Sequence, residues 1–122
     1  MDIPKTMSGV VLTGHGGPEQ LQWRDDLPIR QPGPTDVLIR VRAAGVNNTD
    51  VNTRVGWYAK DGDGGGWAGD PLVFPRIQGA DVCGTVVMAG DAIDQGRVGQ
   101  RVIIEPCLVE AKGNMLDKTW YL

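Results

Sequence analysis

The chain has 122 residues, of which 41% are apolar, and this is enough for one domain with a modest core. The net charge of −3 is small and lysines and arginines do not cluster, so nothing indicates nucleic-acid binding. No apolar run approaches the roughly 18 residues of a membrane span. The first residues lack the basic and apolar regions of a signal peptide. The composition therefore predicts a cytoplasmic protein that binds neither nucleic acid nor membrane.

Three strands are predicted in the first half of the chain, at residues 8–14, 21–28 and 36–44. The third alternates apolar side chains with Arg40 and Arg42, which is typical of a half-buried strand. Glycines and a proline at 14–18 predict a turn between the first two strands. His15, the only histidine, lies inside this turn and is interpreted as a turn residue rather than a catalytic one.

The second half predicts two more strands, at residues 79–90 and 98–106. Gly84 within the first of them indicates a bend or a close approach between backbones. Pro106 ends the last predicted strand, and no closing strand is evident after it. No segment carries a sustained helical stripe. The fold class is therefore mainly β, a small, partly open barrel with short helical turns.

A polar stretch follows the strand at 36–44 and breaks its pattern. So many hydrogen-bonding groups are poor core material, and they favour a short helical turn that borders a cleft. A solvated surface turn is the alternative. Asp50 and Arg54 are spaced i,i+4 and would pair on a helix. The candidate residues in this turn are Asn47, Asn48, Thr49, Asp50 and Arg54.

Aromatic residues follow this turn and flank a glycine-rich segment. Trp57, Tyr58 and Trp67 would either line the mouth of a substrate site or cover one end of the barrel. The segment at 62–69 holds five glycines but is not a phosphate loop, because such a loop needs a helix after it.

Several motifs now converge in one order. They are Gly16-Gly-Pro-Glu19, Gly45-Val-Asn-x-x-Asp-x-x-x-Arg-x-Gly56, Pro75-x-x-x-Gly-x-Asp-x-x-Gly84-x-Val and Val98-Gly-x-Arg-Val. In this order and spacing they resemble the medium-chain dehydrogenase/reductase superfamily. The resemblance covers nearly the whole chain and implies the GroES-like N-terminal catalytic domain of such an enzyme, at residues 1–122.

The branch is suggested by residues that differ from the zinc enzymes of this superfamily. Asn47 stands where the zinc alcohol dehydrogenases carry a cysteine ligand, and Ala80 stands where they carry a histidine ligand. An amide oxygen is a poor substitute for a thiolate, and alanine has no donor atom. The resemblance therefore implies the zinc-independent, quinone oxidoreductase-like branch, with no metal site and with NADPH as cofactor.

That branch transfers hydride from the cofactor to a quinone or an α,β-unsaturated carbonyl, and negative charge develops on the substrate oxygen. Without a metal, hydrogen-bond donors must stabilise this charge. By resemblance, Asn47 and Thr49 are the catalytic donors, and Asp50 orients their turn. Contacts with substrate or cofactor are expected for Asn48, Arg54, Trp57 and Tyr58. Asp81 holds the position of a carboxylate beside the zinc site and is expected to make a structural hydrogen bond. The alternative is that Asn47 and Asn48 only cap the turn.

The chain contains no Gly-x-Gly-x-x-Gly fingerprint between a strand and a helix. In the family, a Rossmann domain that follows this one holds the cofactor. The chain alone is therefore expected to be an inactive, incomplete domain whose unpaired strand edges favour a homo-oligomer. Two alternatives remain open. They are a zinc-type alcohol dehydrogenase-like protein, and a stand-alone GroES-like binding or assembly module.

Overall fold

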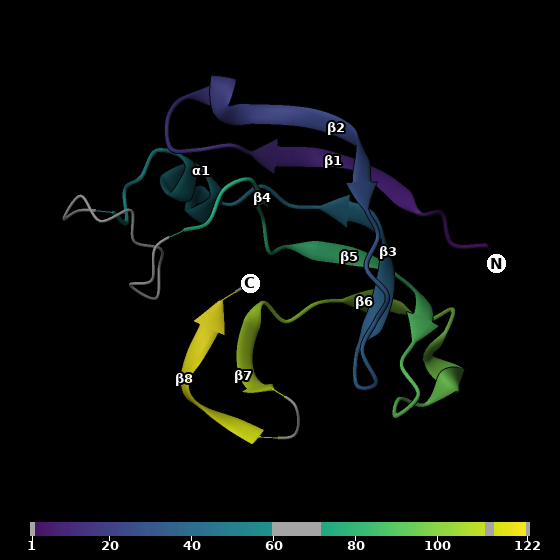
Figure 1. Ribbon diagram of the computed structural model, residues 1–122. Helices are drawn as coiled ribbons and strands as arrows, with labels where there is room; N and C mark the ends of the chain where they lie inside the picture. Colours follow the sequence, from purple (N-terminus) through teal and green to yellow (C-terminus); the bar gives the residue numbers. More distant parts are fainter. Residues whose placement is uncertain (1, 60–71, 112–113, 122) are drawn as a thin grey trace.

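The computed structural model describes residues 2–59, 72–111 and 114–121, and within them the chain forms eight strands, one α-helix and two 3-10 turns (Figure 1). The strands are β1 (Thr6–Leu12), β2 (Leu21–Pro28), β3 (Val37–Ala44), β4 (Arg76–Ile77), β5 (Val82–Ala89), β6 (Arg101–Ile103), β7 (Cys107–Ala111) and β8 (Asn114–Tyr121). The helix is α1 (Asn48–Arg54), and the 3-10 turns are η1 (Pro18–Gln20) and η2 (Gln95–Arg97). The prediction of a mainly β fold with short helical turns is confirmed.

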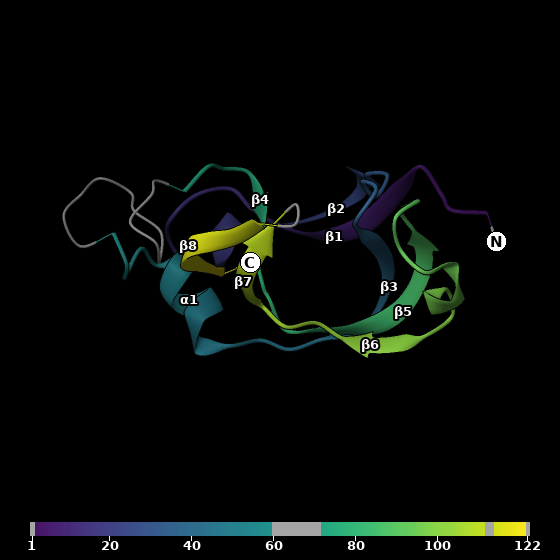
Figure 2. The same ribbon diagram turned by 90° about the horizontal axis from the view of Figure 1, so that it is seen from below.

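Two three-stranded sheets carry the fold. One sheet has the order β2-β1-β4 and the other has the order β3-β5-β6, and every pairing is antiparallel. The first sheet begins with a hairpin, in which Val10 lies opposite Trp23 and Leu12 lies opposite Leu21. Strands β7 and β8 form a separate hairpin. Seen from below, β3 curves between the two layers, and α1 lies at the end of the molecule away from the N-terminus (Figure 2).

Gly84 is the point of closest approach between β3 and β5. A Cβ atom at this position would overlap the carbonyl oxygen of Arg40 and the side chain of Ile39. Gly84 pairs with Val41, and the β3–β5 register shifts on both sides of this pair, at Leu38/Ile39 and at Val41/Ala43. The expected close backbone approach is confirmed, and only glycine fits it without displacing the neighbouring strand.

The core is small and lies where the two sheets face each other. Leu12 and Val86 are almost completely buried, at 0% and 1% exposed, one from each sheet. Among the residues whose burial the structure describes, the other buried apolar side chains are Val11, Leu27 and Ala89. The expected alternation of burial along β3 is not seen, because residues 37–39 are half-buried and residues 40–44 are all exposed, Val41 at 54%. Full burial of a valine or leucine side chain contributes about 1.5–3 kcal/mol, so these few residues carry much of the stability.

The strands predicted at 8–14, 36–44 and 79–90 correspond to β1, β3 and β5, with ends that differ by a few residues. The strand predicted at 21–28 is β2, with the same bounds. The strand predicted at 98–106 is shorter, because β6 ends at Ile103 and η2 precedes it. Strand β4 and the β7–β8 hairpin were not predicted. Strands β7 and β8 do follow Pro106, but within the described residues they pair with each other, and neither pairs with β1 to close a barrel.

Large apolar side chains are exposed on several elements. Val46 is 88% exposed, Ile103 is 81% exposed and Trp23 is 72% exposed. Within the ranges that the structure describes, no helix is long and apolar enough to span a bilayer.

Candidate functional site

The polar stretch after β3 forms helix α1, and Asn47 is its N-cap. Asn47 has an extended backbone, and its Oδ1 accepts a hydrogen bond from the backbone N–H of Thr49 at 3.2 Å. In return, the backbone N–H of Asn47 donates to Oδ2 of Asp50 at 2.8 Å. This reciprocal pair is a capping box, which satisfies N–H groups that a helix start leaves without partners. The structure thus shows Asn47 as the N-cap of α1, with the Asp50 carboxylate bonded to its backbone.

The first hairpin turn holds the other end of α1. The Nη1 of Arg54 donates to the carbonyl of Gly16 at 2.8 Å, and the N–H of Gly16 donates to the carbonyl of Arg54 at 2.8 Å. His15 adds a third bond, because its Nδ1 lies 2.9 Å from the carbonyl oxygen of Thr53. A carbonyl only accepts, so Nδ1 carries the proton. The last carbonyls of α1 are thus satisfied by a loop 38 residues away.

These contacts correct one prediction and extend another. Asp50 and Arg54 do not form the expected i,i+4 ion pair, because Asp50 bonds to the N-cap and Arg54 bonds to Gly16. Within the described residues, the ion pair found is Arg24 with Asp26, at 2.8 Å. His15 is more than a turn residue, since it also contacts Phe74 edge to face at a centroid distance of 5.1 Å. No local sequence signal indicated this role, because its partners lie far along the chain.

The aromatic pair after α1 packs against the helix. The rings of Trp57 and Tyr58 lie edge to face with centroids 5.0 Å apart, and Trp57 is 52% exposed. The N–H of Trp57 donates to the carbonyl of Asn52 at 2.9 Å, and the side-chain amide of Asn52 approaches the hydroxyl of Tyr58 at 3.5 Å. Trp57 and Tyr58 therefore lie in the turn that directly follows α1. Trp67, the third predicted aromatic residue, lies outside the described residues.

Asp81 brings the second half of the chain to the helix start. Its carbonyl accepts the N–H of Gly45 at 2.8 Å, and its Oδ2 accepts from Nδ2 of Asn47 at 3.3 Å. The expected structural hydrogen bond of Asp81 is therefore present, and its partner is the predicted catalytic amide.

Several donors of the turn remain available. In the part of the chain that the structure describes, the Thr49 hydroxyl has no hydrogen-bond partner, and the second Nδ2 hydrogen of Asn47 has no acceptor. Asn47, Asn48 and Thr49 are all exposed. A neutral hydroxyl and an amide N–H, both accessible, can donate to an anionic oxygen. Whether they contact substrate or cofactor stays a prediction.

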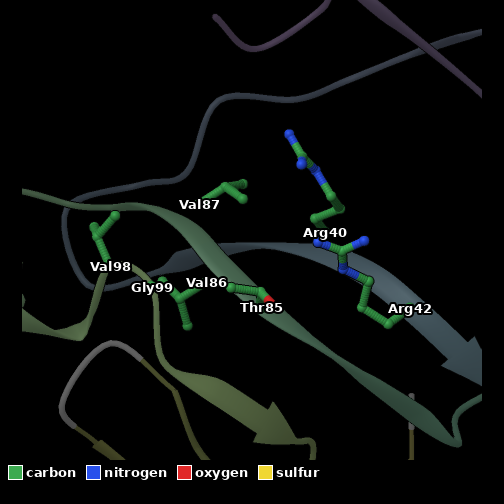
Figure 3. A pocket seen from close by; sticks show the side chains of 7 residues that line it. All are labelled: Arg40, Arg42, Thr85, Val86, Val87, Val98 and Gly99. Carbon is green, nitrogen blue, oxygen red and sulfur yellow. The ribbon is translucent and has the colours of Figure 1, made fainter. Parts of the chain in front are cut away.

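No cluster of three or more His, Cys, Asp or Glu side chains suited to a metal ion occurs among the described residues. A shallow hollow of about 160 Å³ lies elsewhere, on the β3–β5–β6 sheet, with Arg40, Arg42 and Thr85 on its wall (Figure 3). None of the predicted site residues lines this hollow. The hollow is therefore separate from the polar turn that carries the candidate site residues.

Fold and site together define a small, open, mainly β domain with a capped polar turn at one end. Residues 33–119 match the alcohol dehydrogenase GroES-like domain. The chain is 36% identical over 85 residues to L-threonine 3-dehydrogenase from Chelativorans sp., covering 70% of this chain and 22% of the relative. It is 35% identical over 98 residues to human quinone oxidoreductase, covering 80% and 27%.

Solved structures agree with this result. A putative alcohol dehydrogenase from Sinorhizobium meliloti superposes with a TM-score of 0.78 at 37% identity, over 98% of this chain and 35% of that one. Quinone oxidoreductase from Escherichia coli, in complex with NADPH, superposes with a TM-score of 0.63 at 26% identity, over 79% and 26%.

The chain therefore belongs to the alcohol dehydrogenase GroES-like domain family, within the medium-chain dehydrogenase/reductase superfamily. It spans about a quarter of the length of the curated relatives that it matches. Those relatives are oxidoreductases, and the predicted superfamily is confirmed.

Proposed function

We propose that this chain is the catalytic-domain part of an NADPH-dependent, quinone oxidoreductase-like enzyme. Its substrate would be a quinone or an α,β-unsaturated carbonyl. The similarity to human quinone oxidoreductase and to the Escherichia coli enzyme with NADPH supports this choice. The observation that carries it is the pair of unpartnered donors, the Thr49 hydroxyl and the second Nδ2 hydrogen of Asn47, on a turn that a capping box holds in place.

These donors define what the chain itself contributes. When bound, NADPH supplies the hydride. Asn47 and Thr49 then donate hydrogen bonds to the substrate oxygen as it gains negative charge, while the bond that Asp50 accepts from the Asn47 N–H keeps the turn in place. Such donors act best when they are fixed before the reaction. Asn48, Arg54, Trp57 and Tyr58 are proposed to border the substrate and the nicotinamide. The role of Arg54 is proposed to be indirect, because its side chain is bonded to the carbonyl of Gly16 and holds the end of α1.

The donor set also supports the zinc-independent branch. The Oδ1 of Asn47, the only amide atom that could ligate a metal, already accepts a hydrogen bond from the Thr49 N–H. Ala80 has no ligand atom. Thiolate and imidazole are the ligands that a catalytic zinc normally takes, and neither occurs at these two positions. We therefore propose no metal at this turn.

The dinucleotide is proposed to be held mainly by a Rossmann domain outside these residues, because no phosphate-binding fingerprint occurs in them. The chain alone is then expected to be inactive, and to associate with a second copy through unpaired strand edges. A cytoplasmic location stays part of the proposal.

A second candidate is an alcohol dehydrogenase of the threonine dehydrogenase type, since that relative matches at 36% identity. The stand-alone GroES-like assembly module has only the fold in its favour. Sizing chromatography tests the module, because a closed ring of fixed size would support it over a monomer or dimer.

The test uses the protein expressed from the complete open reading frame that encodes this chain. NADPH oxidation is followed at 340 nm with 1,4-benzoquinone and with a simple enone, and the reverse reaction is followed with threonine and with ethanol. Thr49→Val keeps the shape and the backbone bond but removes the hydroxyl. It is expected to lower kcat by about tenfold or more. Asp94→Ala, which removes the capping bond of η2 and lies away from this turn, is the control.

The proposal fails if the protein oxidises alcohols and reduces neither quinone nor enone. It also fails if Thr49→Val and Asn47→Ser leave turnover unchanged. In that case the two donors have no part in the reaction.

A further inference from the structure

Asp81 is fixed against the start of α1 by its backbone. The N–H of Gly45 donates to the Asp81 carbonyl at 2.8 Å, which places the two chain segments side by side. A Cβ atom on Gly45 would lie 3.1 Å from Cβ of Asp81, so a side chain at position 45 would displace this contact. The Asp81 carboxylate is therefore held next to the N-cap although it lies 34 residues further along the chain.

The orientation of the Asn47 amide depends on what lies at its two ends. Oδ1 faces the backbone N–H of Thr49, which is only a donor, and Nδ2 faces a carboxylate, which is only an acceptor when ionised. The flipped amide would oppose oxygen to carboxylate and NH₂ to N–H. Both contacts would then be repulsive. Without Asp81, only the 3.2 Å bond to Thr49 would select the orientation.

We propose that Asp81 is a positioning residue that fixes the Asn47 side chain with one Nδ2 hydrogen left for the substrate oxygen. This inference rests on the proposed function. In the described part of the chain nothing else accepts that second hydrogen. An amide that rotates freely would present Oδ1 to the developing negative charge for part of the time, and this would oppose the reaction.

The negative charge of Asp81 is a cost to the same reaction, since a carboxylate near an oxyanion repels it. Asp81→Asn separates the two effects. Its Oδ1 can still accept from Asn47, while the charge is gone. Asp81→Ala removes both the acceptor and the charge. A positioning role predicts that Ala impairs the site and Asn does not.

The first experiment uses the full 122-residue chain and NMR of the Asn47 side-chain amide. In the wild type, the two Nδ2 hydrogens are expected to be well separated in chemical shift, with a high ¹⁵N order parameter. Asp81→Ala is expected to reduce the separation of the two shifts to that of a free asparagine amide and to lower the order parameter, and Asp81→Asn to keep both near wild type. Asp94→Ala, at η2, is the control and should change neither. If Asp81→Ala does not fold, Asp81→Ser is used, because its shorter side chain also lacks the reach.

The second experiment uses the protein from the complete reading frame. Asp81→Ala is expected to lower kcat about tenfold with KM changed less than about twofold, because the transition state loses an oriented donor. Asp81→Asn should retain most of kcat or exceed it. An Asn47 amide as ordered in Asp81→Ala as in the wild type would overturn the positioning. Equal losses of kcat in the Ala and Asn variants would overturn it as well.

Failure of the proposed function is a different outcome. It would appear as no turnover of quinone or enone by the wild type, while the NMR experiment still decides whether Asp81 fixes the amide. The two claims can therefore fail separately.

Discussion

Replacing Asn47 by alanine tests how far the stability of helix α1 depends on its N-cap. The substitution removes the bond from the Thr49 N–H at 3.2 Å and the exposed bond to Asp81 at 3.3 Å. Loss of an asparagine cap costs about 1 kcal/mol, and the exposed bond adds roughly 0.5 kcal/mol at most. For a chain of this size, this free-energy change lowers Tm by about 4–6 °C. Asn47→Ser retains a capping oxygen and is expected to stay within about 1–2 °C of the wild type.

Thermal unfolding by circular dichroism measures the global effect, and amide hydrogen exchange over residues 48–54 measures local opening of α1. Exchange should be faster in Asn47→Ala than in Asn47→Ser. In the complete enzyme both variants lose the Nδ2 donor, so both should lose turnover although only one loses stability. A capping role for Asn47 would be contradicted if the alanine variant matched the wild type in both Tm and exchange. A catalytic role for its Nδ2 donor would be refuted if the serine variant kept full turnover.

Three further predictions concern the scaffold. Val86→Ala is expected to destabilise the chain by about 2–3 kcal/mol, because Val86 is 1% exposed, whereas Val41→Ala at 54% exposed should cost much less; urea unfolding of both variants checks this. Gly84→Ala should destabilise by at least about 2 kcal/mol, since the new methyl group overlaps backbone, and a normal urea midpoint would contradict the close approach of β3 and β5. Hydrogen bonds from the backbone N–H groups of Glu19 itself and of Gly17 lower the pKa of the Glu19 carboxyl. The stability it contributes is then present above its ordinary pKa and lost as pH falls through the lowered one, and ¹³C NMR titration of Glu19 would disprove this by showing an unshifted or raised pKa.

Local patterns predicted the strands well where turn residues mark both ends. β2 is an example, because η1 precedes it and prolines and a glycine follow it, and its predicted bounds match the structure. The hairpin β7–β8 was missed because Pro106 was interpreted as a stop. A proline ends one ladder but does not prevent a new pairing from beginning at the next residue.

The candidate site was found by its polarity, but its connections were not. An i,i+4 spacing brings Asp50 and Arg54 within reach, yet each side chain has a partner outside the helix. The contact between Asn47 and Asp81 and the contact between His15 and Thr53 span 34 and 38 residues. Local propensity carries no information on such long-range contacts. The family pattern placed Asp81 near the site without identifying its partner.

The hydrogen bonds between the Gly14–Gly17 turn and the end of α1 have a consequence for the order of folding. A seven-residue helix is marginal in isolation, and here its last carbonyls are satisfied by groups that come together only when β1 and β2 have paired. Helix α1 should therefore form late in folding, after β1 and β2 have paired. Mutations in the strands of that hairpin are then expected to destabilise α1 although they lie outside its direct contacts.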